Sequence, residues 1–472
     1  MKILRKVLWE VMGVLGHFIE DMKRKRVRIH SAVIMSGGVI QEEAYLGRYD
    51  ADTLTRMYSA SKSVMAVAIG KLIGEGRLSL DDRIVDIFAD RFDMTGVHPY
   101  MKEQTIKQML CMTTCLSTPA YDENNKDWLA SYFRANPTHP AGTVWNYDSS
   151  GSYVLGAVVK HITGLDFIEY LRPELDIIGV SPDVYCMKGP DGEAWASSGF
   201  MATTADLARI AYLLLSGGSW NGKQLIPKDY VRDAISPLVR NGDASVVSYF
   251  DCGYGYQIWS HPGGAFAFRG LGGQIAIGYP ERDLVFSCNS DSAAHHNAYD
   301  EIFYAVENII LPEYPVQTPP LEAPIPRVDV SKTVFERIKG VRYKIDENPM
   351  GIEEVCFGGD EVNIVLEYVR RGVKHIFRLS TDEETDFVFP EKYSGTMLFS
   401  REHMMNYNCS AVAAWYQTNK LHVTIYAEDL YVGNMTMCFA FRDDLIGIKM
   451  DKCAQFFFDG YVGFAGGRAA DR

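Results

Sequence analysis

The sequence predicts a mixed α/β (α+β) protein, in which an antiparallel sheet flanked by helices carries a helical lobe and is followed by a small all-β domain. Two apolar runs around Gly37-Gly38 indicate a β-hairpin, because a glycine pair permits a tight turn. Strand-like segments return only near residue 254, and helical segments fill the interval. Beyond residue 327 the helical pattern disappears, and short segments with turn signals between them predict an antiparallel barrel or sandwich.

The individual elements follow from the spacing of apolar residues. In the first domain, strands are predicted at 29–35, 39–46, 254–259, 265–268, 274–277 and 284–288. Helices are predicted at 203–215, 229–235 and 297–309, in addition to a buried helix that starts near Ser59 and ends near Gly74. In the second domain, strands are predicted at 352–357, 362–368, 375–379, 411–416, 422–427 and 435–442.

A proline-rich stretch divides the chain. Residues 312–326 contain six prolines, a composition typical of a semi-rigid linker. We therefore predict a helical segment in residues 1–27, a first domain in 28–311, a linker in 312–327 and a small antiparallel β domain in 328–472. The last domain shows no catalytic constellation, and it could cover a cleft, mediate dimerisation or stabilise the fold.

The first 27 residues predict an amphipathic helix. Apolar residues from Leu4 to Met22 recur on one helical face, and the basic cluster Lys23-Arg24-Lys25-Arg26 follows them. We expect this helix to pack on the sheet, and contact with an anionic membrane surface is the alternative. Glu10 and His17 interrupt the apolar run, so we expect neither a signal peptide nor a membrane span.

Composition and missing motifs limit the function. The formal net charge of -13 argues against a nucleic-acid partner, because phosphate binding needs a basic face. Nine scattered cysteines without a disulfide framework fit a cytoplasmic protein. The sequence has no H-E-x-x-H, paired C-x-x-C, G-x-S-x-G or P-loop pattern. We therefore expect no metal, no cofactor and no Ser-His-Asp triad.

The most informative stretch is Ser59-Ala60-Ser61-Lys62, at the start of the buried helix. Residues three apart share a helix face, so the Lys62 amine can reach the Ser59 hydroxyl and act on its proton. The free amide N–H groups of a first helical turn can stabilise an oxyanion. Chance also produces S-x-x-K sequences, and Ser59 could be only the N-cap of this helix.

Two further segments could share a cleft with Ser59. Tyr147-Asp148-Ser149 lies between an aromatic segment and an apolar helix, where it presents a phenol and a hydroxyl. The glycine-rich stretch Gly270-Leu271-Gly272-Gly273-Gln274 opens a buried strand, and glycines there allow a ligand to approach the backbone closely.

In this order, the three segments resemble the motifs of the serine β-lactamase and penicillin-binding protein superfamily, specifically its class C-like esterases, D-amino-acid peptidases and amide hydrolases. The matching pieces are S-x-x-K at Ser59 to Lys62, Y-x-[NS] at Tyr147 to Ser149, and the third-motif strand at Gly270 to Gln274. The resemblance covers roughly residues 28–310. It implies catalytic roles for Ser59, Lys62 and Tyr147, and substrate-binding or oxyanion roles for Ser149, Gly270, Gly272, Gly273 and Gln274.

The third motif departs from the usual pattern. Most class C-like members begin it with lysine or histidine, whereas this chain has Gly270. That cation usually helps to hold a substrate carboxylate and tunes the tyrosine, so its absence argues against recognition of β-lactams and D-Ala-D-Ala. Arg269 is adjacent, but alternation along a strand directs it to the opposite face. The Gly-x-Gly-Gly-Gln form is more similar to 6-aminohexanoate-dimer hydrolase and related carboxylesterases.

The expected function is a serine hydrolase that cleaves a small ester or amide through a Ser59 acyl-enzyme. Either a neutral Lys62 amine or a Tyr147 phenolate could take the serine proton. The N–H of Ser59 and one N–H from Gly272-Gly273 would form the oxyanion hole. The alternatives are an acyltransferase, a D-amino-acid peptidase or β-lactamase of the same fold, and a non-catalytic ligand-binding or sensor module. The expected partner is a small-molecule substrate, and a homo-oligomer is an open alternative to a monomer.

Overall fold

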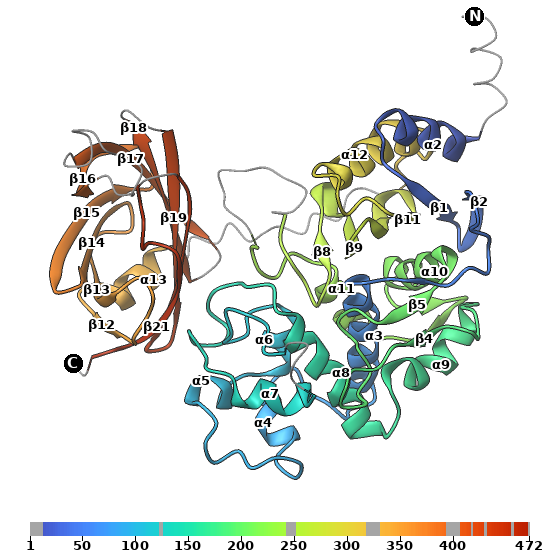
Figure 1. Ribbon diagram of the computed structural model, residues 1–472, viewed down its shortest axis with the longest axis horizontal. Helices are drawn as coiled ribbons and strands as arrows, with labels where there is room; N and C mark the ends of the chain where they lie inside the picture. The colour runs from blue at the N-terminus through green and yellow to red at the C-terminus, as the bar shows by residue number, and fades with distance from the viewer. Residues whose placement is uncertain are drawn as a thin grey trace, which may run out of the picture.

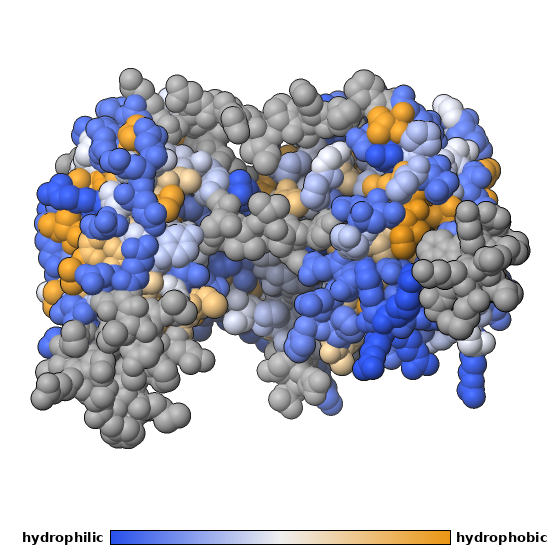
Figure 2. Space-filling model, turned by 90° about the horizontal axis from the view of Figure 1, so that it is seen from above, coloured by the Kyte–Doolittle hydropathy of each residue, from blue (hydrophilic) through white to orange (hydrophobic). Residues whose placement is uncertain are grey.

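The computed structural model of the protein describes residues 13–121, 126–241, 252–317, 331–392, 406–416, 419–428, 432–454 and 457–470. Within these ranges the chain forms an α+β lobe that ends at residue 317 and a β lobe that begins at residue 331 (Figure 1). Hydrophilic residues cover much of the described surface in the view from above, with smaller hydrophobic patches among them (Figure 2). Each lobe has its own apolar core.

An antiparallel sheet lies at the centre of the α+β lobe. Its described strands, in spatial order, are β2 (Val39–Tyr45), β1 (Ile29–Ser36), β11 (Leu284–Ser290), β10 (Gln274–Tyr279), β9 (Phe266–Gly270) and β8 (Trp259–Ser260). Side chains alternate between its faces, so that Val33 and Phe268 join one core while Ile34 and Ala267 join another. The early hairpin therefore pairs with the late strands, as predicted.

Helices cover both faces of this sheet. One face carries α2 (Val14–Arg24) and α12 (Ala298–Ala305), and the other carries α3 (Ala60–Gly74) and α10 (Thr204–Leu215). The apolar face of α2 is buried against the sheet, so the described part of the predicted N-terminal helix packs as expected. Residues 1–12 lie outside the described ranges. Among the described helices, none combines the length and apolar character needed to cross a membrane.

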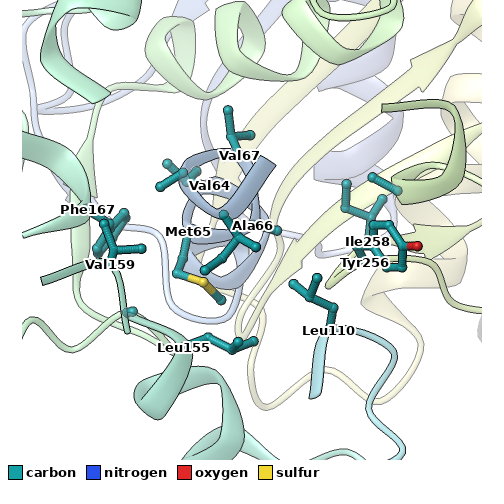
Figure 3. Close-up of a cluster of buried hydrophobic side chains, with 14 of the residues drawn as sticks. Val64, Met65, Ala66, Val67, Leu110, Leu155, Val159, Phe167, Tyr256 and Ile258 are labelled. Carbon is teal, nitrogen blue, oxygen red and sulfur yellow. The ribbon is translucent and has the colours of Figure 1, made fainter. Parts of the chain in front are cut away.

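The helical lobe is built around α3. It contains α4 (Ile84–Ile87), α5 (Pro99–Lys102), α6 (Ile106–Leu110), α7 (Trp128–Arg134), α8 (Ser149–Thr163), α9 (Phe167–Ile177) and α11 (Lys228–Ala234). Short strands β3 (Thr55–Arg56), β5 (Phe200–Ala202) and β4 (Tyr185–Cys186) form a small sheet, and β6 (Ser219–Trp220) pairs with β7 (Lys223–Gln224). Figure 3 shows α3 in the middle of the core, between Val159 and Phe167 on one side and Tyr256 and Ile258 on the other.

The described strands of the β lobe curl into a nearly closed barrel (Figure 1). In spatial order they are β15 (Val373–Ser380), β14 (Asn363–Arg370), β13 (Ile352–Gly359), β12 (Arg342–Ile345), β21 (Gly463–Ala469), β20 (Leu445–Cys453), β19 (Val432–Arg442), β18 (Lys420–Glu428), β17 (Asn406–Tyr416) and β16 (Thr385–Lys392). Alternate residues such as Val423 and Ile448 fill the interior, and helix α13 (Ser331–Ile338) packs against them through Phe335. The predicted barrel or sandwich is a barrel.

The barrel contacts the helical lobe through small residues on its outer face. A Cβ atom at Gly447 on β20 would lie 2.1 Å from Thr143 Oγ1, so only glycine permits this approach. Nearby, the Tyr100 hydroxyl donates a hydrogen bond of 2.5 Å to Asp346 of the β lobe. The loop that carries Thr143 continues to Tyr147, so the barrel braces a segment that holds a predicted catalytic residue.

Three local predictions need correction. Residues 254–259 were predicted as a strand, but only Trp259–Ser260 is one, because Gln257 has a left-handed φ of 59° and interrupts the extended backbone. The third-motif strand ends at Gly270, and residues 271–273 form a turn. The last helix is α-helical only to Ala305 and continues as a π-helix over Val306–Ile310. Residues 318–330 of the predicted linker lie outside the described ranges.

We expect Gly447→Ala to destabilise the contact between the lobes. The added methyl group would overlap Thr143, whose hydroxyl is fixed by a hydrogen bond to the Pro140 carbonyl, and such overpacking costs about 1–3 kcal/mol. Thermal unfolding measures the effect. The control is Gly358→Ala on β13, where the new Cβ would meet Val365 at an ordinary 3.8 Å and should leave the melting temperature unchanged or slightly higher. Equal melting temperatures for the two variants would contradict this account.

Candidate active site

Ser59 lies where a short strand turns into the buried helix α3. Strand β3 pairs with β5, and the Met57 N–H donates a hydrogen bond of 2.8 Å to the Phe200 carbonyl. Tyr58 then adopts a left-handed conformation with φ of 46°, which is costly for a residue with a side chain. Although Ser59 is at the N-cap position, its hydroxyl makes no capping hydrogen bond. Its oxygen is therefore available to another group.

That group is the amine of Lys62. Its Nζ atom lies 3.0 Å from Ser59 Oγ and donates a second hydrogen bond of 2.7 Å to the carbonyl of Ser197. The Lys62 side chain is 1% exposed. Burial disfavours the charged form and lowers the pKa of Lys62 to about 7, against the opposing effect of the Asp148 carboxylate. Near neutral pH, a large fraction of Lys62 is therefore an uncharged amine.

Tyr147 lies on the other side of this pair. Its ring centroid is 4.9 Å from Lys62 Nζ, and the ring stacks on Trp259 with centroids 5.7 Å apart. Burial raises the pKa of Tyr147 above its usual value, while a hydrogen bond with Ser59 lowers it to a lesser degree. At neutral pH, Tyr147 is therefore a protonated phenol within reach of the Ser59 hydroxyl.

Asp148 anchors the segment that carries Tyr147 and Ser149. It is the N-cap of α8, and its buried carboxylate accepts hydrogen bonds of 2.9 Å from Ser150 N and from Thr114 Oγ1. Burial raises the pKa of Asp148, and these hydrogen bonds oppose the rise. Sequence analysis did not single out Asp148, although aspartate before an apolar helix is an N-cap signal.

Ser149 joins the same cluster through Tyr121. Tyr121 shares a hydrogen bond with Ser149, and its hydroxyl is 3.1 Å from Ser197 Oγ. The Tyr121 ring stacks on Trp128 with centroids 4.4 Å apart. Because the Ser197 carbonyl accepts the Lys62 hydrogen bond, Ser149 lies close to the polar groups around Lys62.

Gly270 lies against the backbone that precedes Ser59. A Cβ atom at position 270 would be 2.1 Å from the Met57 carbonyl oxygen, so the third motif has no room for a side chain here. The Tyr299 hydroxyl donates a hydrogen bond to the Gly270 carbonyl and fixes the end of β9. Gly272 follows in the turn with φ of 83°. The first and third sequence motifs are thus brought together.

Gly273 and Gln274 stabilise the turn through hydrogen bonds, and their substrate-binding or oxyanion role stays a prediction. The Gly273 N–H donates to the Gly270 carbonyl at 3.1 Å. The Gln274 amide donates to the carbonyls of Leu271 (3.0 Å) and Ser290 (2.9 Å), and it accepts from Ser290 N at 3.2 Å. The polar atoms of Gln274 are therefore engaged. Of the turn residues, Leu271 and Gly272 have N–H groups that find no acceptor within the described ranges.

Gln257 is a supporting residue that sequence analysis missed. Its side chain donates to the Leu110 carbonyl at 3.1 Å and accepts from Ser152 Oγ at 2.6 Å, while its own carbonyl accepts from Ser63 Oγ at 2.7 Å. It thereby links α6, α8 and α3 next to Lys62. Sequence analysis missed Gln257 for two reasons. A positive φ leaves no mark on the sequence at a non-glycine residue, and a buried glutamine looks the same in a sequence as one in a surface turn.

Arg269 does not contact Ser59 or Lys62 in the described structure. Its guanidinium carbon lies 4.9 Å from the ring centroid of Phe303 on α12 and 5.0 Å from that of Trp259, the ring that stacks on Tyr147. Metal ligands do not gather either: within the residues that the structure covers, no three His, Cys, Asp or Glu side chains are placed to hold a metal ion. The polar groups around Ser59 are therefore an amine, a phenol, hydroxyls and backbone groups.

Comparison with known proteins shows which proteins this chain is similar to. Residues 16–175 match the family model described as Beta-lactamase. The match contains the first two motifs, at Ser59 to Lys62 and Tyr147 to Ser149, whereas the third motif at Gly270 to Gln274 lies outside it. The resemblance that the three motifs carry is confirmed, and with it the class of serine hydrolase to which the chain is related.

Three relatives show how far the likeness extends. The 6-aminohexanoate-dimer hydrolase of Paenarthrobacter ureafaciens is 24% identical over 254 residues, covering 48% of this chain and 63% of that hydrolase. The crystal structure of a family VIII carboxylesterase has a TM-score of 0.51 and 16% identity, covering 62% of this chain and 96% of the other. The crystal structure of SurE has a TM-score of 0.52 and 16% identity, covering 96% of this chain and 98% of the other. The last likeness includes the barrel.

If Lys62 is the general base, kcat/KM should fall about tenfold for each pH unit below pH 7, because protonation of an amine with a pKa of about 7 removes the base. A pH profile of ester turnover measures this. Tyr147→Phe should lower the rate but leave the acidic limb in place.

Asp148→Asn provides an internal check on this assignment. The Asp148 carboxylate raises the pKa of Lys62, so its removal should move the acidic limb to lower pH. A limb that disappears in Tyr147→Phe and does not move in Asp148→Asn would assign the titration to another group.

Proposed function

We propose that the protein is a serine hydrolase that cleaves a small ester or amide through an acyl-enzyme on Ser59. The observation that supports this most directly is the buried Lys62 amine, which lies 3.0 Å from Ser59 Oγ. A buried lysine without a carboxylate partner would be costly in a purely structural role. Next to a serine hydroxyl that caps no helix, its lowered pKa makes it suited to accept a proton.

In the proposed reaction, Ser59 Oγ attacks the carbonyl carbon as its proton passes to Lys62 Nζ. Lys62 is favoured over Tyr147 as the base, because burial lowers the pKa of the amine but raises that of the phenol. Tyr147, a protonated phenol beside Ser59, is then placed to pass a proton to the leaving group. In the second half of the reaction, water attacks the acyl carbon and gives a proton to the Tyr147 phenolate, while the protonated Lys62 returns its proton to the departing Ser59 oxygen.

The oxyanion would be held by backbone N–H groups. The Ser59 N–H at the start of α3 has no acceptor within the described residues. Gly270 lies beside Met57, which precedes Ser59 by two residues, so the turn after Gly270 is close to this N–H. Because the Gly273 N–H is already used in the turn, Leu271 or Gly272 is the better source of the second donor. Each such donor contributes roughly 3 kcal/mol to the transition state.

The most direct test is covalent labelling of Ser59. A fluorophosphonate probe should add one adduct to the wild-type protein, detected by intact mass, and none to Ser59→Ala. Ser61→Ala is the matched control, because Ser61 Oγ donates to the Tyr58 carbonyl and is not directed at Lys62; that variant should still be labelled. A wild-type protein that takes no adduct would instead favour a ligand-binding or sensor module.

A substrate panel tests the reaction type. We expect turnover of p-nitrophenyl esters and little or no turnover of nitrocefin, because the third motif has no space for a lysine or histidine at Gly270. Initial rates under matched conditions make the comparison, with D-amino-acid amides as a third class. Nitrocefin turnover comparable to ester turnover would contradict the importance given to this missing cation. Addition of an alcohol or amine acceptor to the assay detects acyl transfer, which would use the same acyl-enzyme.

A further inference from the structure

A group of basic side chains lies where the barrel meets the α+β lobe, and the proposed chemistry does not use it. Lys420 and His422 are on β18, Lys449 is on β20, and Arg240 follows α11 in the other lobe. The strand register places His422, Cys438 and Lys449 in one row across three neighbouring strands. Lys420 lies two residues before His422 and shares the outer face of the barrel. We refer to Arg240, Lys420, His422 and Lys449 as the basic cluster.

The members of the basic cluster lie close to one another. The Arg240 guanidinium carbon is 4.1 Å from the ring centroid of Tyr416, a residue paired with Lys420 across β17 and β18. The His422 ring meets the same tyrosine edge to face, with centroids 4.8 Å apart. Burial, together with the positive charges of Lys420, Arg240 and Lys449, lowers the pKa of His422 to about 3. His422 is therefore neutral, and the other three members supply the charge.

The basic cluster has no anionic partner in the described parts of the chain. Lys420 is 3% exposed; burial lowers the pKa of its amine, and within the described ranges no carboxylate is among the charged groups that shift this pKa. Arg240 Nε is buried and has no hydrogen-bond partner in these ranges. A buried cation without a partner destabilises a protein by several kcal/mol. Because the partly buried Arg240 and Lys449 lie beside the buried Lys420, one anionic ligand would interact favourably with all three side chains.

Aromatic rings connect the basic cluster to the candidate active site. Lys449 Nζ lies 5.9 Å from the ring centroid of Trp145, and that centroid lies 6.3 Å from the ring of Tyr147. Trp259 stacks on Tyr147 and contacts Trp145 edge to face. Two aromatic rings therefore separate Lys449 from the Ser59 hydroxyl. Such rings provide a surface against which an alkyl chain can pack.

We propose that the basic cluster binds a carboxylate at the far end of the acyl chain, so that the barrel supplies the cation that the third motif lacks. This rests on the proposed hydrolase function and defines its substrate class as small esters or amides of dicarboxylic acids. Lys420, Lys449 and Arg240 would donate charge-assisted hydrogen bonds to the carboxylate. The chain between the carboxylate and the scissile carbonyl would lie along Trp145 and Tyr147.

The test compares mono-p-nitrophenyl esters of glutarate, adipate, suberate and sebacate with the same compounds carrying a methyl ester in place of the free carboxylate. One acyl chain should have the length that spans the distance from Ser59 to the basic cluster. For that chain length, the free acid should have a lower KM than its methyl ester in the wild-type protein. Lys420→Met and Lys449→Met should each raise that KM about tenfold or more, the range of a hydrogen bond to a charged group, and leave the methyl ester unaffected. Lys374→Met, on an exposed lysine of β15, is the matched control and should change neither substrate.

Stability provides a second readout that distinguishes binding from a structural role. Lys420→Met should raise the melting temperature of the ligand-free protein, because methionine removes an unpaired charge from a buried position. Free suberate should raise the melting temperature of the wild-type protein but not that of Lys420→Met. A lysine that only supports the fold would give a lower melting temperature when replaced.

Two results would overturn the proposal: equal KM values for the acid and its methyl ester in the wild-type protein, or equal losses on both substrates in the lysine variants. Failure of the hydrolase function is a separate outcome. If no ester is turned over, calorimetric titration of Ser59→Ala with suberate still tests the basic cluster. Binding of suberate to Ser59→Ala that is lost when Lys420→Met is added supports the proposed anion site. Absence of suberate binding to Ser59→Ala refutes it.

Discussion

The burial of the Lys62 amine is the constraint on which the rest of the site depends. An amine that is 1% exposed has lost its water, and the Ser59 hydroxyl and the Ser197 carbonyl are the two acceptors that replace it. The Ser197 carbonyl must therefore be held in place. Arg56 does this from the neighbouring strand, because its guanidinium donates to the carbonyl of Ser198 at 3.0 Å and to its hydroxyl at 2.8 Å. The small sheet thus serves as the support for the Lys62 amine.

The same tight packing explains the unusual third motif. The strained turn at Tyr58 directs the Met57 carbonyl toward β9, and this oxygen occupies the place where a side chain of residue 270 would begin. A lysine or histidine at this position would require the turn before Ser59 to move. The missing cation is therefore a consequence of how closely β9 approaches Ser59. Gly270 therefore cannot supply a cation to an anionic substrate group, and the proposed carboxylate site uses side chains from another part of the chain.

Sequence reasoning succeeded where the geometry is local. The contact between Ser59 and Lys62 follows from helix periodicity, and the barrel strands that alternate strongly, such as β14, were predicted almost to their ends. Sequence reasoning failed where the position of a side chain depends on a backbone carbonyl or on the conformation of a turn. The acceptor at Ser197 is a carbonyl that every residue possesses, so no side chain marks it.

The turn at 271–273 and the barrel strands that were missed have the same origin. The Gln274 amide supports this turn through its hydrogen bonds, and a sequence does not show which groups such an amide will bind. Among the strands that were missed, β16 contains Pro390, and β21 contains three glycines. Both residue types weaken a strand signal, although strands at turns and close contacts tolerate them.

The register of the barrel ties the docking of the two lobes to the position of the basic cluster. Lys420, Ala440, Gly447 and Gly466 form one row across β18 to β21, and the two glycines allow the loops of the helical lobe to approach closely. The neighbouring row carries His422 and Lys449. A slip of one residue would turn the lysines into the apolar interior and remove the small residues from the contact. The pattern that docks the barrel is therefore the same pattern that brings positive charge next to Trp145.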